Sequence, residues 1–204
     1  TDIVCHVRNT GRCAELFRPG CRVWVQHNPS PTRKTAWTLI TVDKDGVLVN
    51  VDSLAPNKLF AEAVTKGILV PASLSRVEQM RPEVKLGSSR LDWQLTGPEG
   101  RLWCEVKGVT LEQDGTALFP DAPTLRGLGH VETLRRLRSE GDFAMAAFLV
   151  QMEGIRRFRP NTAAQPDFAR ALREAREAGV EIVCCGCRVT PDSVEPAYLI
   201  PVEL

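Results

Sequence analysis

The chain has 204 residues, of which 43% are hydrophobic and 25% charged, and its formal net charge at pH 7 is +1. This balance is typical of a globular protein with a buried core, in one large domain or two small ones. No run of about 20 apolar residues occurs, so we expect no membrane-spanning helix and no membrane partner.

The seven cysteines form no pattern that indicates a disulfide framework or a zinc site. Zinc would need a pair of CxxC motifs or His at ligand spacing, and the sequence has no such pair. Most of these thiols stand in apolar, strand-like sequence, where a thiol behaves as a small hydrophobic group. We therefore expect reduced cysteines and a cytoplasmic protein.

Residues 3–51 alternate apolar and polar side chains over short runs and show almost no helical periodicity. This pattern predicts strands at residues 3–7, 22–26, 37–42 and 47–51. Short strands at this spacing are typical of a small β-barrel. Because the chain begins without Met and almost inside a strand, we expect one further strand before Thr1, which would complete a five-stranded OB-fold. We place this domain at residues 1–54.

The loop at residues 27–37 combines two prolines, a basic pair and an aromatic side chain. Such a loop suits contacts with a nucleic-acid backbone and stacking on a base. Arg33 and Lys34 are therefore candidate nucleic-acid-binding residues. The alternative is a solvated loop with Trp37 in the core, and the sequence does not decide between the two.

From residue 55 onward helices and strands alternate, and we assign residues 55–204 to a second domain. Helices are expected at residues 58–67, 124–141 and 166–179. Strands are expected at residues 143–151, 180–187 and 198–202, and a polar loop at residues 113–115. This order predicts a mixed sheet with helices packed against it, in an α+β domain.

Residues 81–110 predict short strands joined by a tight Gly-Pro-Glu-Gly turn at residues 97–100. Because side chains alternate along a strand, Glu105 and Lys107 project from one face, and Asp92 on the neighbouring strand can join them. An acid followed by acid-x-Lys is the arrangement used for metal-assisted cleavage of a phosphodiester. The alternative is a surface salt bridge, worth less than about 1 kcal/mol.

Several short motifs, spread along the whole chain, carry a resemblance to a known family. In chain order they are RNTG, NPSPTRK, PNKLFAEAV, GSSRLDWQL, CEVKGVTL, FPDAPTLRG, FLVQ and AREAGVEIVCCGCRVTP. With these segments the chain resembles the sugar fermentation stimulation protein A family over essentially its whole length. The resemblance implies an N-terminal OB-fold followed by a domain similar to the PD-(D/E)xK nucleases, in agreement with the two regions described above.

The resemblance implies a nuclease site in the second domain. Asp92 and Glu105 would be its catalytic acids and Lys107 its lysine, although Leu91 replaces the Pro of the motif's name. Glu62, on the helix before the sheet, is placed like the acidic residue that such folds often carry there.

The cofactor implied by these residues is Mg²⁺ (or Mn²⁺), because hard carboxylate oxygens suit such ions. Asp92, Glu105 and the backbone carbonyl of Val106 would be its protein ligands. Gln151, at the end of its strand, would be an auxiliary residue. The sequence leaves open whether one or two ions act.

DNA is the partner that the resemblance implies. Besides Arg33 and Lys34, the candidate DNA contacts are Asn9, Arg126 and His130, although the last two could simply cap or solvate their helix. Many arginines surround Arg126 in the sequence, and a solvated helix face explains most such runs. The chain departs from the family, where polar side chains are usual near the rim of the site, at Gly129, Met152 and Gly154.

The sequence therefore predicts a DNA-binding protein with magnesium-dependent DNA nuclease activity. The alternative is a non-catalytic DNA-binding regulator of sugar (maltose) metabolism genes, as the family name suggests. RNA stays open as a partner because OB-folds bind either polymer. The oligomeric state is open as well, a homodimer included.

Overall fold

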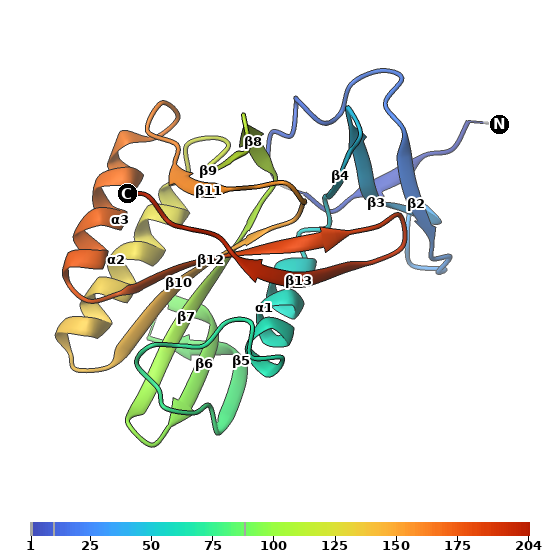
Figure 1. Cartoon of the computed structure of the whole chain (residues 1–204). Coiled ribbons are helices and arrows are strands. Elements are labelled where there is room, and N and C mark those ends of the chain that lie inside the picture. The colour runs from blue at the N-terminus through green and yellow to red at the C-terminus, as the bar shows by residue number, and fades with distance from the viewer. Residues whose placement is uncertain (1, 10, 88) are drawn as a thin grey trace.

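A computed structural model of the chain describes residues 2–9, 11–87 and 89–204. An N-terminal group of strands is followed by a larger part that contains all three helices (Figure 1). Within these described ranges, no helix combines the length and the apolar character needed to cross a membrane.

The N-terminal region is a four-stranded sheet in which β3 pairs with β1, β2 and β4. Its strands are β1 (Cys5–Val7), β2 (Val23–His27), β3 (Trp37–Lys44) and β4 (Val47–Asn50). The turn from β3 to β4 places Asp45 and Gly46 at positive φ, 53° and 93°, and the Gly46 N–H donates to Asp43 Oδ1 over 2.7 Å. This is the turn chemistry that a two-residue hairpin requires. The strands predicted for residues 3–51 are therefore confirmed.

A six-stranded mixed sheet forms the centre of the larger region, in the order β13-β12-β10-β7-β6-β5. Neighbours from β5 to β7 are antiparallel, those from β7 through β10 to β12 are parallel, and β13 is antiparallel to β12. The strands are β5 (Gln79–Leu86), β6 (Ser89–Gly97), β7 (Gly100–Val109), β10 (Phe143–Val150), β12 (Glu181–Val189) and β13 (Val194–Leu199).

Helices cover both faces of this sheet (Figure 1). They are α1 (Ala55–Thr65), α2 (Leu125–Ser139) and α3 (Pro166–Glu177). The alternation along β7 explains the arrangement, because Leu102 and Cys104 pack with α1 while Trp103 packs with α2 and α3. The α+β architecture predicted from the order of the elements is confirmed.

The predicted bounds of the last strand were wrong, and three short strands were missed. The polar loop predicted at residues 113–115 is the turn of a hairpin, which belongs to a separate three-stranded sheet. Its strands are β8 (Leu111–Gln113), β9 (Thr116–Phe119) and β11 (Arg157–Pro160). The last strand of the chain is β13 and not residues 198–202. These strands are short, and β9 pairs with β11 across about forty residues, so local patterns do not reveal them.

The hydrophobic core continues from the large sheet into the N-terminal one. Val49 of β4 and Phe158 of β11 belong to the same buried cluster, together with Met152. Met152 is 0% exposed and pairs its backbone with Val49. The expectation that Met152 lies at the rim of the site was therefore wrong, because it joins the two regions in the core.

Candidate functional site

Asp92 lies where β6 and β7 separate. The pairing of these strands runs from Gly97 opposite Gly100 up to Trp93 opposite Cys104 and then stops. Beyond this point the carboxylate of Asp92 replaces a backbone acceptor, because its Oδ2 accepts the N–H of Val106 over 2.8 Å. The N–H and C=O of one strand residue point to the same side. The carbonyl of Val106 therefore also faces the gap beside Asp92.

Glu105 and Lys107 project from the same face of β7, as the alternation predicts. Glu105 is 4% exposed, and its Oε1 contacts both Lys107 Nζ and Nδ1 of His130 on α2. The two nitrogens are themselves 3.1 Å apart. The other oxygen, Oε2, is buried and has no hydrogen-bond partner among the described residues. One carboxylate oxygen is thus held by two nitrogens, and the other is left able to bind a ligand.

The surroundings move the pKa values of the two acids in opposite directions. Burial, followed by the nearby charge of Glu105, raises the pKa of Asp92 although the Val106 N–H, Asn57 and Lys107 oppose the shift. Burial alone would raise the pKa of Glu105 too, but its bonds to His130 and Lys107 outweigh burial and lower the pKa. The two carboxylates are therefore close enough to sense each other's charge.

A hard divalent cation fits the oxygen atoms at this gap. Oε2 of Glu105, which lacks a partner in the described ranges, is a buried acceptor that such a cation would satisfy, and Asp92 and the Val106 carbonyl supply further oxygens. Among the described residues, no group of three His, Cys, Asp or Glu side chains could hold a metal alone. Magnesium typically uses one or two carboxylates and completes its coordination with waters and substrate phosphates, so this set is sufficient.

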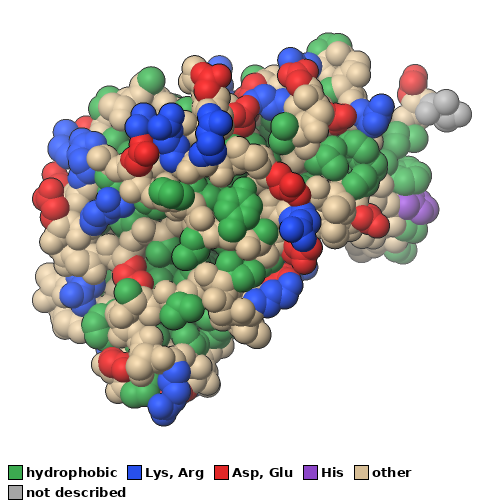
Figure 2. All heavy atoms as spheres, viewed as in Figure 1, with side chains coloured by type: hydrophobic (Ala, Val, Ile, Leu, Met, Phe, Trp, Pro, Cys, Tyr) green, Lys and Arg blue, Asp and Glu red, His purple; other side chains and the backbone are tan. Residues whose placement is uncertain are grey.

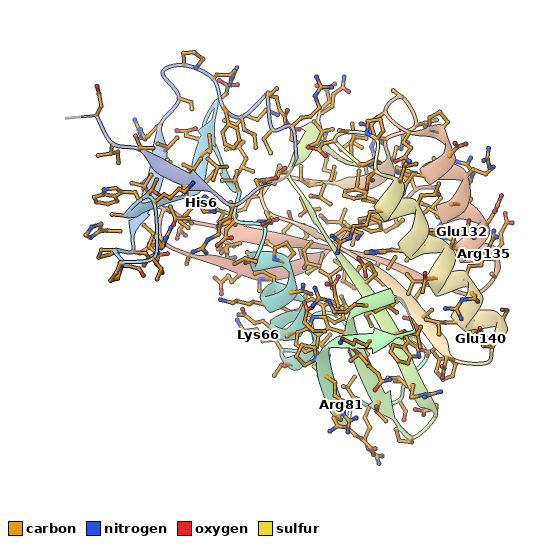
Figure 3. The ribbon with its side chains drawn as sticks, turned by 180° about the vertical axis from the view of Figure 1, so that it is seen from behind. His6, Lys66, Arg81, Glu132, Arg135 and Glu140 are labelled. Atoms are coloured by element: carbon orange, nitrogen blue, oxygen red, sulfur yellow. The ribbon has the colours of Figure 1, made fainter. Side chains whose placement is uncertain are left out.

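The contact from α1 to the acids is made by Asn57, which sequence reasoning missed. Its Nδ2 donates to Asp92 Oδ1 over 3.1 Å, and its own Oδ1 accepts Trp93 Nε1–H over 3.0 Å. Glu62 instead pairs with Lys66 at 2.6 Å, and Figure 3 shows Lys66 near the end of α1. The structure does not bring Glu62 to Asp92 and Glu105.

A cleft of about 520 Å³ runs beside Lys107, between the segment that follows β1 and the start of α2. Asn9 and Gly11 line it from the N-terminal region, and Arg126 lines it from the first turn of α2. Lys107 is the residue shared by the cleft and the pair of acids. A polymer lying in the cleft would therefore pass next to the acids.

Of the predicted DNA contacts, Asn9 and Arg126 line this cleft. The guanidinium of Arg33 is instead tied within its own region, to Thr38 Oγ1 at 2.5 Å and the Asn28 carbonyl at 3.3 Å. Lys34 is exposed on the same loop. His130 contacts Glu105 and Lys107, and its side chain is only 17% exposed. It therefore belongs to the acidic site rather than to the open cleft.

Gln151 is buried at the junction of the two regions. Its Nε2 lies within hydrogen-bond distance of Asn50 O (3.0 Å), Asn50 Oδ1 (2.8 Å) and Asp52 O (3.2 Å). A Cβ at Gly108, the residue after Lys107, would lie 2.5 Å from Gln151 Oε1. The glycine therefore allows Gln151 to pack against the strand that carries the site.

Acidic partners neutralise many of the arginines that follow Arg126. The ion pairs are Arg135–Glu132, Arg135–Glu174, Arg136–Glu140 and Arg159–Glu203. Figure 3 shows Glu132 and Arg135 on α2, and Figure 2 shows acidic side chains among the basic ones over the end that holds α3 and β11. These arginines fit the solvated helix face. Arg126 differs, because it lines the cleft and makes no ion pair with the described residues.

Comparisons with known proteins match both regions. A family model described as "Sugar fermentation stimulation protein RE domain" matches residues 54–193, and one described as "SfsA N-terminal OB domain" matches residues 1–51. A sugar fermentation stimulation protein homolog from Desulfitobacterium hafniense (strain Y51) is 41% identical over 201 residues, which cover 98% of this chain and 86% of the relative. The homolog from Clostridium beijerinckii is 42% identical over 191 residues, covering 94% and 83%.

Among solved structures, SfsA of Pyrococcus furiosus in complex with Ca²⁺ is similar with a TM-score of 0.86 and 28% identity, covering 98% of this chain and 85% of that chain. The likeness extends through the N-terminal sheet and the mixed sheet with its three helices. The chain belongs to the sugar fermentation stimulation protein family, with an N-terminal OB domain and a second, α+β domain built on the mixed sheet.

Proposed function

We propose that this protein is a nuclease that hydrolyses phosphodiester bonds of DNA with the help of Mg²⁺ or Mn²⁺. The observation that carries the proposal is the buried Oε2 of Glu105, which has no hydrogen-bond partner in the part of the chain that the structure describes. Asp92 is close to Glu105, and Lys107 lies at the edge of the cleft. A surface salt bridge would not bury an acceptor in this way, because an unsatisfied buried oxygen costs about 1–3 kcal/mol.

The relative from Pyrococcus furiosus supports a divalent cation in this family, because it was solved with Ca²⁺. Calcium and magnesium both prefer oxygen ligands. Asp92, Glu105 and the Val106 carbonyl would hold the cation here. When bound, it would polarise the phosphodiester and lower the pKa of a nucleophilic water.

The chain's own residues have separate roles in this proposal. Lys107 reaches both Glu105 and the cleft, so its ammonium would stabilise negative charge on the phosphate as water adds to phosphorus and the ester P–O bond breaks. Asn57 would keep Asp92 oriented. Arg126 and Asn9 would contact the phosphate backbone along the cleft.

A cleavage assay tests the proposal. Purified protein is incubated with supercoiled, linear and single-stranded DNA, and with RNA, in MgCl₂, MnCl₂ or EDTA. We expect cutting that needs the metal and is lost in Glu105→Ala and Lys107→Ala. Glu140→Gln, on the solvent side of α2, is the matched control and should cut normally.

The outcomes separate this proposal from the alternatives. Wild-type protein that cuts no DNA form but binds DNA with strong salt dependence would be a non-catalytic DNA-binding protein. The family's description would then favour a role in regulating sugar metabolism genes. Cutting confined to RNA would keep the chemistry and change the substrate.

A further inference from the structure

The two oxygens of the Glu105 carboxylate differ in a way that calls for an orienting group. Oε1 contacts Lys107 and His130, whereas Oε2 has no partner among the described residues and is buried. A carboxylate can exchange its oxygens by turning about its last bond. An interaction that fixes Oε1 therefore also fixes the position of Oε2.

His130 is better suited to this task than Lys107. Lys107 lines the cleft, and its long flexible side chain has to turn toward a phosphate there. His130 instead projects from α2, a helix that is anchored in the core by Val131, Leu134 and Leu137. Its imidazole ring has two side-chain torsions and a fixed base, so its Nδ1 is a stable reference point.

We propose that His130 is a positioning residue that holds Glu105 by Oε1 and thereby presents Oε2 to the divalent cation. The carboxylate only accepts hydrogen bonds, so the Nδ1–H of His130 is the donor. Outer partners of this kind orient metal ligands in many sites, and their loss typically lowers metal affinity about 10–100-fold. This role rests on the proposed metal site and assigns His130 no contact with DNA.

The placement of His130 favours this role over the DNA contact that the sequence predicts. Arg126 and His130 are four residues apart, so they share one face of α2. Arg126 is exposed and lines the cleft, while His130 lies deeper, with a side chain 17% exposed. On this face of α2, Arg126 therefore lines the cleft, whereas His130 contacts Glu105.

Titration of the metal-free protein with MnCl₂ in a calorimeter, without DNA, tests the proposal directly. His130→Ala should bind Mn²⁺ about 10–100-fold more weakly than wild type. His130→Asn should recover most of the affinity, because its amide NH₂ takes the position of Nδ1–H. His130→Gln should not, because its amide reaches the position of Nε2. Glu132→Gln, on the same helix but paired with Arg135, is the control and should bind like wild type.

The comparison of His130→Asn with His130→Gln keeps the test valid if the alanine variant folds poorly, and circular dichroism establishes which variants are folded. Equal Mn²⁺ affinity in wild type and in folded His130 variants would overturn the positioning role and leave the proposed function intact. No Mn²⁺ binding by wild type would overturn the metal site itself. Loss of DNA binding by His130→Ala in EDTA would overturn positioning in favour of a direct DNA contact.

Discussion

Asp92 and Glu105 are on neighbouring strands, but the groups around each of them differ. Asp92 loses solvation and faces a second negative charge, so its pKa lies above the ordinary 3.8. Glu105 is more deeply buried, yet His130 and Lys107 bring its pKa below the ordinary 4.5. Acids whose pKa values are shifted by burial and by specific charged partners are typical of functional sites.

We expect a carbon-13 NMR titration of the side-chain carboxyls in the metal-free protein to give a pKa above the ordinary 3.8 for Asp92 and below the ordinary 4.5 for Glu105. Protonated Asp92 favours folding, so its contribution is complete below about pH 3.8 and lost as pH rises through its folded pKa. Glu105 contributes above about pH 4.5 and loses its contribution as pH falls through its folded pKa. A Glu105 pKa at or above its ordinary value would contradict the contacts described for Glu105.

The cysteines differ in accessibility. Burial raises the pKa of Cys13 to about 11 and that of Cys104 well above its ordinary value. Cys5 and Cys21 are only partly buried. We expect a short pulse of iodoacetamide at pH 8, followed by mass spectrometry, to label Cys5 and Cys21 first, because the thiolate is the reactive form. Labelling of Cys104 in folded protein would show that β7 opens more readily than its burial indicates.

At the scale of one element, α2 contains two glycines with opposite surroundings. Gly129 is exposed, and a Cβ there would meet open space, so Gly129→Ala should raise the free energy of unfolding by about 0.5–1 kcal/mol. Gly127 is buried, and a Cβ there would lie 2.7 Å from Thr124 Cγ2. Gly127→Ala should therefore destabilise the protein. Urea denaturation measures the free energy of unfolding of both variants. A stabilising Gly127→Ala would contradict the close contact between Gly127 and Thr124.

The sequence predicts elements well where a pattern is long and local. β10 and α3 have continuous apolar or amphipathic runs, and both form close to their predicted positions. The strands β8, β9 and β11 have at most four residues each, so their pairing depends on chain segments that only the complete fold brings together. Short strands of this kind carry little periodic signal.

The candidate site was predictable only in part, for the same reason. Asp92, Glu105 and Lys107 lie on one hairpin, so strand alternation places the last two on one face. For α1, sequence alone does not fix the rotation of the helix. Asn57 faces Asp92, and Glu62 is five residues later, about 140° around the axis, so it points elsewhere. The contact of His130 with Glu105 depends on how α2 packs, which no local pattern reveals.

At the scale of the whole molecule, the cleft has walls from both regions, so its shape depends on how they are held together. The apolar core crosses the junction through Val49 and Met152. Gln151 adds polar contacts, since its side chain bonds Asn50 and Asp52 and its main chain bonds Asn50. The acceptors of this buried amide lie in the linker between the two regions (residues 50–54). A hydrogen-bonded amide specifies one orientation more strictly than apolar contacts do.

We expect Gln151→Ala to loosen this junction, because it leaves buried carbonyls of the linker without a donor, at a cost of about 1–3 kcal/mol for each such group. The exposed Leu54 of the linker should then be cut faster by thermolysin. Gln165→Ala is the matched control, since its buried amide joins α3 to Thr124 inside one domain. It should lower stability without exposing the linker. Equal cleavage at Leu54 in both variants would mean that the apolar core alone fixes the cleft, and that Gln151 only fills space.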